Sequence, residues 1–239
     1  MLCLRKLEIA MNDKEESSLA LQFDENHLVR LTFNLTYVLL MTTATITIIE
    51  ALRNKDPRIR HILNIETCIS VVAAYFYGEF IKLIQENPIN YKQINQMRYS
   101  DWFITTPMML LVLCLVLAYN NDEEVHLSTY GVILALNILM LLAGYLGTIG
   151  QIARTRALFI GFLAFFAMFA YIWFIFLQGR ARGNSLLVYM LFFVIWSIYG
   201  LVYLWEERKK NMSYNVLDLV AKCLVGLFLW AYFTHILVV

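Results

Sequence analysis

The sequence has few of the residues that interrupt helices, and it lacks the motifs of the common soluble binding folds. Three prolines and ten glycines are spread over 239 residues. No glycine-rich phosphate loop and no low-complexity tract occurs. The four cysteines have no metal-ligand spacing, and three of them lie in apolar segments where a disulfide framework is not built. The net charge of +1 suggests neither a nucleic-acid partner nor a polybasic membrane-surface anchor.

What the chain has instead is apolar residues. They make up 60% of the sequence, and the mean hydropathy is +0.63. Soluble domains are about 45–50% apolar. The excess predicts a polytopic membrane protein.

The first 27 residues are mixed and charged. They lack the uninterrupted apolar core and the small-residue cleavage site of a secretory signal. We therefore expect residues 1–27 to form a tail, with a short amphipathic segment lying at the membrane interface.

Seven apolar runs follow, each about as long as a bilayer-spanning helix needs to be. They cover residues 28–52, 60–85, 96–119, 127–150, 155–178, 184–205 and 213–237. The connections are short, so sequential helices should pack as antiparallel neighbours. The prediction is an all-α bundle of seven transmembrane helices over residues 28–239. Basic residues are divided almost evenly between the two sets of loops, so the positive-inside rule does not orient it.

Two of the runs carry ionisable side chains in their apolar bodies. Lys222 lies about ten residues into the last run, and Asp218 precedes it by one helical turn. The run 96–119 supplies Arg98, Asp101 and Thr105 at spacings of three and four. An ionisable group at mid-bilayer costs from about 2.5 to above 10 kcal/mol, so such residues indicate function when a partner can be named.

Two interpretations fit this set. In the first, the charges form a structural ion-pair network that joins the two helices. In the second, Lys222 is an amine in an apolar pocket that forms a Schiff base with an aldehyde, and Asp101 and Asp218 are the anions that balance its charge.

Aromatic residues at helical spacing are consistent with a pocket for a long apolar cofactor beside the lysine. They are usually simple core packing, and they support the second interpretation only if they line the cavity that the lysine enters. These residues are Trp102 and Met109, then Phe162, Phe165 and Phe169, then Trp196, Tyr199 and Tyr203.

The segments "RYSDWFITTP", residues 98–107, and "DLVAK", residues 218–222, resemble the two signature segments of the microbial (type 1) rhodopsins. The resemblance covers all seven runs. It implies an integral multi-pass membrane protein, not an enzyme, with all-trans retinal bound covalently to Lys222 as a protonated Schiff base. It also implies an extracellular N-terminus, a cytoplasmic C-terminus, lipid and protons as partners, no metal, and a homo-oligomer, either a pentamer or a trimer.

The resemblance assigns roles position by position. Asp101 corresponds to the primary counter-ion and proton acceptor, Asp218 to the second counter-ion, Arg98 to the arginine that gates the extracellular side, and Thr105 to the hydroxyl partner of the acceptor. The implied retinal-pocket positions are Tyr77, Trp102, Thr106, Pro107, Met109, Phe162, Trp196, Tyr199 and Tyr203, with Tyr77 also reaching the counter-ion cluster.

Two departures from the family pattern matter. Val112 stands where bacteriorhodopsin-like pumps carry their cytoplasmic proton donor, and Gly200 replaces a proline. Glu66, about two turns inside the cytoplasmic end of the second run, is a substitute donor, because an apolar setting would keep it protonated in the dark. The alternative is that Glu66 faces water or pairs with the nearby basic loop. A glutamate in this role is similar to the pattern of viral rhodopsins from large algal and protist viruses, most of all their proton-pump-like group.

Further charged or aromatic residues are predicted near the two ends of an ion path. On the cytoplasmic side these are Glu50, Arg60 and Trp230, and the alternative for each is an interfacial anchor. On the extracellular side either Glu79 or Glu86 is the expected proton-release group.

The function that these features favour is an outward light-driven proton pump. A light-gated cation channel is the main alternative, since Glu66 and Glu79 could line a path. Against the channel, Cys223 follows the lysine where channels have asparagine, and the cysteine–aspartate gating pair is absent, with Thr106 and about Met140 in its place. A sensory photoreceptor is the third reading. Asp101 disfavours anion pumping, because anion pumps replace this carboxylate.

Overall fold

The computed structural model describes residues 2–86, 88–179 and 183–234, with side chains described from residue 27 onward. This part of the chain is helical and contains no strand. The first four helices are α1 (Leu2–Arg53), α2 (Pro57–Leu83), α3 (Tyr91–Asn121) and α4 (Leu127–Thr148). They are followed by α5 (Arg154–Ile172), which continues into a π-helical turn η1 (Trp173–Leu177), then by α6 (Gly183–Val202), α7 (Glu207–Asp218), a second π-helical segment η2 (Leu219–Leu224) and α8 (Val225–Phe233).

Seven of the helical stretches in the described part are long and apolar enough to cross a membrane, as predicted. The last one, Glu207–Phe233, is the continuous run of α7, η2 and α8. It begins six residues before the predicted start at 213, and the predicted end at 237 lies outside the described residues. The sixth run ends at Val202, earlier than the predicted 205.

The third span also begins earlier than hydropathy predicts, at Tyr91 rather than 96. Asn90 is its N-cap, and the side chain accepts a hydrogen bond from the Gln93 backbone N–H, which would otherwise lack a partner. The helix ends at Asp122, a non-glycine residue with φ of 56° in the left-handed region.

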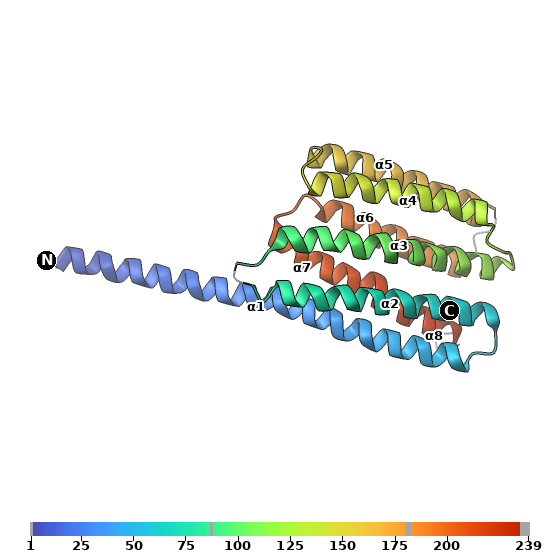
Figure 1. Ribbon diagram of the computed structural model, residues 1–239, viewed down its shortest axis with the longest axis horizontal. Helices are drawn as coiled ribbons and strands as arrows, with labels where there is room; N and C mark the ends of the chain where they lie inside the picture. Colours follow the sequence, from blue (N-terminus) through green and yellow to red (C-terminus); the bar gives the residue numbers. More distant parts are fainter. Residues whose placement is uncertain (1, 87, 180–182, 235–239) are drawn as a thin grey trace.

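The tail does not form a separate helix. Helix α1 continues from Leu2 through the first span to Arg53 without a break, and its N-terminal part extends beyond the bundle (Figure 1). A position of this part at a membrane interface stays a prediction.

The helices pack as antiparallel neighbours, with α1 against α2 and α4 against α5 as the most extensive pairs (Figure 1). The span formed by α7, η2 and α8 contacts α1, α2, α3 and α6, so it lies inside the bundle. Large apolar side chains such as Leu127, Phe159 and Leu163 face outward, while Arg98, Asp101 and Lys222 are buried. A bilayer around the bundle accounts for this distribution, since lipid solvates apolar surface and cannot solvate charge.

Close approach of helices at α4 depends on glycine. A Cβ atom at Gly147 would collide with the Tyr203 hydroxyl and with Ala157 on α5, whereas a Cβ atom at Gly131 on the same helix would meet nothing within 4 Å. Gly147 therefore permits the contact of α4 with α5 and with the residue that follows α6.

We expect Gly147→Ala to lower the free energy of unfolding by about 1–3 kcal/mol, as overpacking of a tight contact does. The matched control, Gly131→Ala, should be neutral or slightly stabilising, because glycine costs about 0.5–1 kcal/mol in a helix. Thermal unfolding of both variants in lipid nanodiscs measures the difference. Equal midpoints for the two variants would contradict the proposed contact.

Candidate functional site

The centre of the site is Lys222 on the π-helical segment η2. Its side chain is buried, and Nζ donates a hydrogen bond to Oδ2 of Asp101 at 2.7 Å. Asp218 Oδ1 lies 3.9 Å from the same nitrogen. π-Helical turns occur frequently at functional sites, where they shift one side chain relative to the regular helical stripe. The two signature segments therefore meet through a lysine and two carboxylates, as the sequence predicts.

Asp218 is held by three further donors. The hydroxyls of Tyr77 and Tyr199 donate to its Oδ2 and Oδ1 at 2.8 and 2.7 Å. Arg98 Nη1 forms an ion pair with Oδ2 at 3.2 Å, and both side chains are fully buried. Asp218 is thus an anion that binds α2, α3, α6 and α7 together.

Two asparagines that the sequence analysis did not identify complete this network. Asn215 Oδ1 accepts a hydrogen bond from Arg98 Nη2 at 2.8 Å, and Asn211 Oδ1 accepts one from the same nitrogen at 3.2 Å. Asn215 also donates to Thr32 on α1 at 2.9 Å. Both asparagines share the helical face of Asp218 and Lys222, at spacings of four, three and four, and this pattern could have revealed them.

Asp101 is less firmly held than Asp218. Besides the lysine, it accepts a hydrogen bond from Thr105, whose Oγ1 lies 3.2 Å from Oδ1 and 2.9 Å from the Asp101 backbone oxygen. The expected partnership of Asp101 and Thr105 is therefore present. Taken together, the buried centre contains two cations and two carboxylates, so its charges balance.

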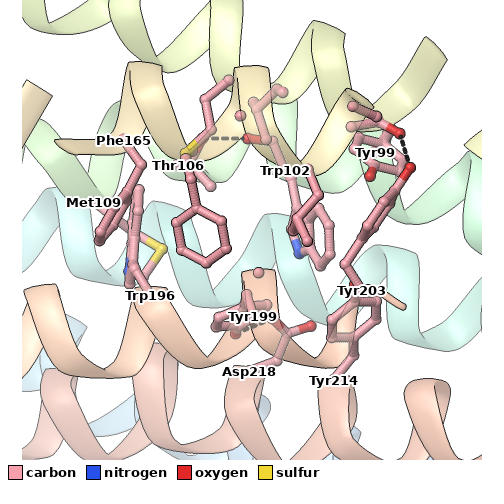
Figure 2. Close-up of a pocket in the computed structure, with 18 of the residues that line it drawn as sticks. Tyr99, Trp102, Thr106, Met109, Phe165, Trp196, Tyr199, Tyr203, Tyr214 and Asp218 are labelled. Carbon is pink, nitrogen blue, oxygen red and sulfur yellow. Dashed lines mark hydrogen bonds between the residues drawn. The ribbon is translucent and has the colours of Figure 1, made fainter. Parts of the chain in front are cut away.

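A cavity extends from Lys222 and Asp218 between the helices (Figure 2). Trp102 and Tyr199 lie at its middle, Met109, Phe165 and Trp196 gather at one end, and Tyr99, Tyr203 and Tyr214 gather at the other (Figure 2). Thr106 and Phe162 also line it. Most of the predicted pocket residues therefore surround one space. Tyr77, Pro107 and Phe169 are not among the lining residues, although Tyr77 contacts Asp218.

Tyr99 and Tyr214 line the cavity but were not predicted. Tyr99 precedes Trp102 by three residues on α3, and Tyr214 precedes Asp218 by four on α7, so each continues a stripe already identified. The same spacing argument would have found both.

The glycine at position 200 makes room for a ring. A Cβ atom there would lie 2.5 Å from Cζ of Phe162. Gly200, which stands in place of the family's proline, thus leaves room for Phe162 to pack directly against the backbone of α6 and to line the cavity.

The pair between α3 and α4 is Thr106 with Asn137, which corrects the expectation that Met140 stands opposite the threonine. Asn137 is fully buried, and its Nδ2 donates to Thr106 Oγ1 at 2.9 Å. Met140 lies one helical turn further on and lines the cavity.

Glu66 is buried, with 2% of its surface exposed, and among the described residues it has no ion-pair partner. A Cβ atom at Gly226 on α8 would lie 3.1 Å from Glu66 Oε2 and 3.1 Å from Cγ2 of Thr43 on α1. The carboxyl therefore lies between α1, α2 and α8, next to Gly226, which follows Lys222 by four residues. The alternative that it faces water or pairs with the basic loop is wrong.

The residues predicted for the ends of an ion path are more accessible. Glu50 and Trp230 are half-buried and Arg60 is exposed. Glu79 forms an ion pair with Lys82 at 2.6 Å, and Glu86 is exposed.

Glu207, a carboxylate that the sequence analysis missed, is connected to Arg98 by hydrogen bonds. Asn211 donates to Asn95 Oδ1 at 3.1 Å, and Asn95 donates to Glu207. Glu207 also pairs with Arg154 at 2.5 Å and with Lys210 at 2.8 Å. No group of three or more metal-ligating side chains occurs in the part of the chain that the structure describes.

The buried ion pair of Arg98 with Asp218 should contribute far more to the free energy of unfolding than an exposed ion pair does. We expect Arg98→Gln to cost about 3–5 kcal/mol, because it leaves Asp218 buried without its cation. Arg58→Gln, which breaks the exposed pair with Asp122 at 2.9 Å, should cost only about 0–1 kcal/mol. Thermal unfolding in nanodiscs compares the two, and a similar loss in both would show that the network around Arg98 contributes little.

Comparison with known proteins agrees with this geometry. The chain is 47% identical to a viral rhodopsin of known structure, OLPVRII, over 88% of this chain and 99% of that one, with a TM-score of 0.84. It is 29% identical to a green-light absorbing proteorhodopsin from Gamma-proteobacterium EBAC31A08 over 56% of this chain, a match that spans 59% of the relative's length. The structure of xanthorhodopsin, described as a light-driven ion pump with dual chromophore, shares the fold with a TM-score of 0.70 at 19% identity, covering 87% of this chain and 92% of that one. A family model described as "Bacteriorhodopsin-like protein" matches residues 29–236, and the chain therefore belongs to the bacteriorhodopsin-like family of membrane proteins.

Proposed function

We propose that this chain is an outward light-driven proton pump with its N-terminus outside the cell and its C-terminus in the cytoplasm. The observation that carries the proposal is the 2.7 Å contact between Lys222 Nζ and Asp101 Oδ2, a buried donor and acceptor in direct reach of each other. Members of the family are light-driven pumps, channels and sensors, not enzymes, and they include proton-pumping relatives. Assembly as a homo-oligomer, a pentamer or a trimer, is part of the same proposal.

Family members bind retinal through a Schiff base to a lysine. The residues of this chain fit that group, because the cavity is lined mostly by rings and apolar side chains and carries an amine at its polar end. Lys222 is the proposed attachment point for all-trans retinal. When bound, retinal supplies the light absorption and the isomerisation that change the proton affinity of the lysine nitrogen.

The two carboxylates near Lys222 have different environments, and this difference supports a different role for each. Asp218 accepts hydrogen bonds from Tyr77, Tyr199 and Arg98, all of which stabilise its charged form. Asp101 has the lysine and one threonine hydroxyl. These environments support the proposed roles of Asp101 as the proton acceptor and of Asp218 as the second counter-ion.

A proton on Asp101 has an exit route on the side of Arg98. Arg98 is joined through Asn211 and Asn95 to Glu207, a carboxylate with 38% of its side chain exposed. Movement of Arg98 away from Asp218 would shift its positive charge along this route. Proton release would then not require a second buried carboxylic acid.

Reprotonation from the cytoplasmic side is assigned to Glu66. Val112, at the donor position of related pumps, is fully buried and cannot carry a proton. Glu66 is buried beside Gly226, four residues after Lys222, in surroundings that disfavour its charged form. A buried carboxylic acid without a cationic partner is suited to hold a proton in the dark and to release it later.

A light-gated channel remains the second candidate, and the position of Glu66 disfavours it. A pore requires side chains that face water, whereas Glu66 is enclosed by α1, α2 and α8. A sensory role would require a partner that reads the light-induced change.

The central test is a light-induced pH change in a suspension of cells that express the protein and are supplied with retinal. We expect acidification of the medium that a protonophore abolishes, and no acidification by Asp101→Asn or Lys222→Ala. Whole-cell recording separates pump from channel, since a pump current keeps its sign across voltages. A current that reverses with voltage would refute the pump.

The donor role has its own test. Glu66→Gln should slow the recovery of the dark-state absorbance after a flash by roughly tenfold or more, the range of a lost general acid, and added azide should restore it. Glu124→Gln, the same change at an exposed site on the cytoplasmic side, should leave recovery unchanged. Unchanged recovery in Glu66→Gln would remove Glu66 as the donor.

A further inference from the structure

Two buried hydroxyls near Glu66 have no hydrogen-bond partner in the described part of the chain. They are Oγ1 of Thr43 on α1 and Oγ of Ser70 on α2, and the two residues are 1% and 0% exposed. Other hydroxyls on the same helices, such as those of Thr47 and Thr67, donate to the carbonyl oxygen four residues earlier. Buried hydroxyls are rarely left without a partner, so two of them near one carboxyl indicate a use other than helix stability.

Ser70 lies between Glu66 and Tyr77 on one face of α2. The three residues are spaced by four and seven, which places them on a single helical stripe. At one end of the stripe the carboxyl of Glu66 lies beside Gly226 on α8, and at the other end the Tyr77 hydroxyl donates to the carboxylate at the end of α7. The segment of the last span between these two contacts is η2, which carries Lys222. Ser70 therefore faces η2.

Thr43 lies at the same level on α1. The hydroxyls of Thr47 and Thr67 share a hydrogen bond of 2.8 Å between α1 and α2, which run antiparallel. One turn further from the loop that joins these helices, α1 reaches Thr43 and α2 reaches Ser70. The two unpartnered hydroxyls are therefore level with each other.

Thr43 also connects the surroundings of Glu66 with the residue after the lysine. A Cβ atom at Gly226 would lie 3.1 Å from Glu66 Oε2 and equally far from Thr43 Cγ2. The thiol of Cys223, which follows Lys222 directly, is buried and interacts with Thr43. Sulfur is only a weak donor and acceptor, so this contact does not satisfy the hydroxyl.

We propose that Ser70 and Thr43 are relay residues, whose hydroxyls pass the proton of Glu66 to the nitrogen of Lys222 after that nitrogen has given its own proton to Asp101. The inference rests on the proposed role of Glu66 as the donor. Each hydroxyl oxygen accepts one proton and gives up another, so both hydroxyls end unchanged. Glu66 is left as a carboxylate, and the lysine nitrogen gains the proton.

The free state of the hydroxyls suits this transfer. A hydroxyl that is bonded to its own helix must break that bond before it can turn, whereas those of Ser70 and Thr43 can turn between a donor and an acceptor. Water completes the chain where the hydroxyls do not reach, as it does between buried polar groups in general.

The test removes each hydroxyl at nearly constant volume, in retinal-bound protein in nanodiscs. Ser70→Ala and Thr43→Val should each slow the recovery of the dark-state absorbance after a flash roughly threefold to tenfold, as loss of one hydrogen bond in the transfer step does. Thr43→Ser, which keeps the hydroxyl, should recover at the rate of the unaltered protein. So should Thr42→Val, the same change at the adjacent exposed position, where the hydroxyl is bonded to the Val38 carbonyl.

Two further readouts do not depend on pumping. The thermal unfolding midpoints of Ser70→Ala and Thr43→Val should be unchanged or raised, because loss of an unpartnered buried hydroxyl removes no interaction. In light-induced infrared difference spectra, the carboxylic acid band of Glu66 is identified by its loss in Glu66→Gln. This band should shift in the two hydroxyl variants.

The outcomes separate the relay from the donor. Slow recovery in Glu66→Gln, with unaltered recovery and an unshifted band in both hydroxyl variants, overturns the relay and leaves Glu66 as the donor. Unaltered recovery in Glu66→Gln removes the donor, and the relay with it. A lowered unfolding midpoint with unaltered recovery in Ser70→Ala and Thr43→Val would show that these hydroxyls are structural, and it overturns the relay as well.

Discussion

The structure depends on the placement of an ammonium group inside an apolar bundle. Lys222 cannot remain charged there without anions, and Asp101 and Asp218 supply them at 2.7 and 3.9 Å. This requirement fixes the register of α3 against the span that contains η2. A second cation, Arg98, is then needed because two carboxylates next to one lysine would leave a buried negative charge. The resulting balance of two cations and two carboxylates connects four of the seven spans.

A cluster of aromatic rings lies between the proposed cofactor space and the polar residues around Arg98. Trp102 packs edge-on against Tyr99, Tyr199 and Tyr214, with centroid distances of 5.2, 5.5 and 5.1 Å. All four residues line the large cavity, and Tyr214 also lies 5.5 Å from the Arg98 guanidinium. Because ring pairs of this kind are rigid and apolar, they close the proposed cofactor space on the side of Arg98.

The seven spans and the centre of the site were predictable from the sequence because each has a local signal. Apolar runs identify the spans, and the cost of a buried lysine identifies Lys222 and the carboxylates near it. The early starts at Tyr91 and Glu207 were not predictable from hydropathy, since those polar turns are stabilised by contacts between spans, such as Asn95 with Glu207. Asn137 was missed for the same reason. Its role exists only because α4 places it opposite Thr106.

Arg98 lies between Asp218 and the hydrogen-bonded residues that lead to Glu207, and its surroundings limit how it can move. Its guanidinium lies 5.0 Å from the ring of Phe80 and 5.5 Å from that of Tyr214, while its Nη atoms hold Asp218, Asn211 and Asn215. In the proposed pump, a proton on Asp101 would weaken the attraction that holds Arg98 on the side of the two carboxylates. The hydrogen bonds of Asn211 and Asn95 lead from Arg98 to Glu207, so Glu207 is the carboxylate that such a change would reach in the proposed release of a proton.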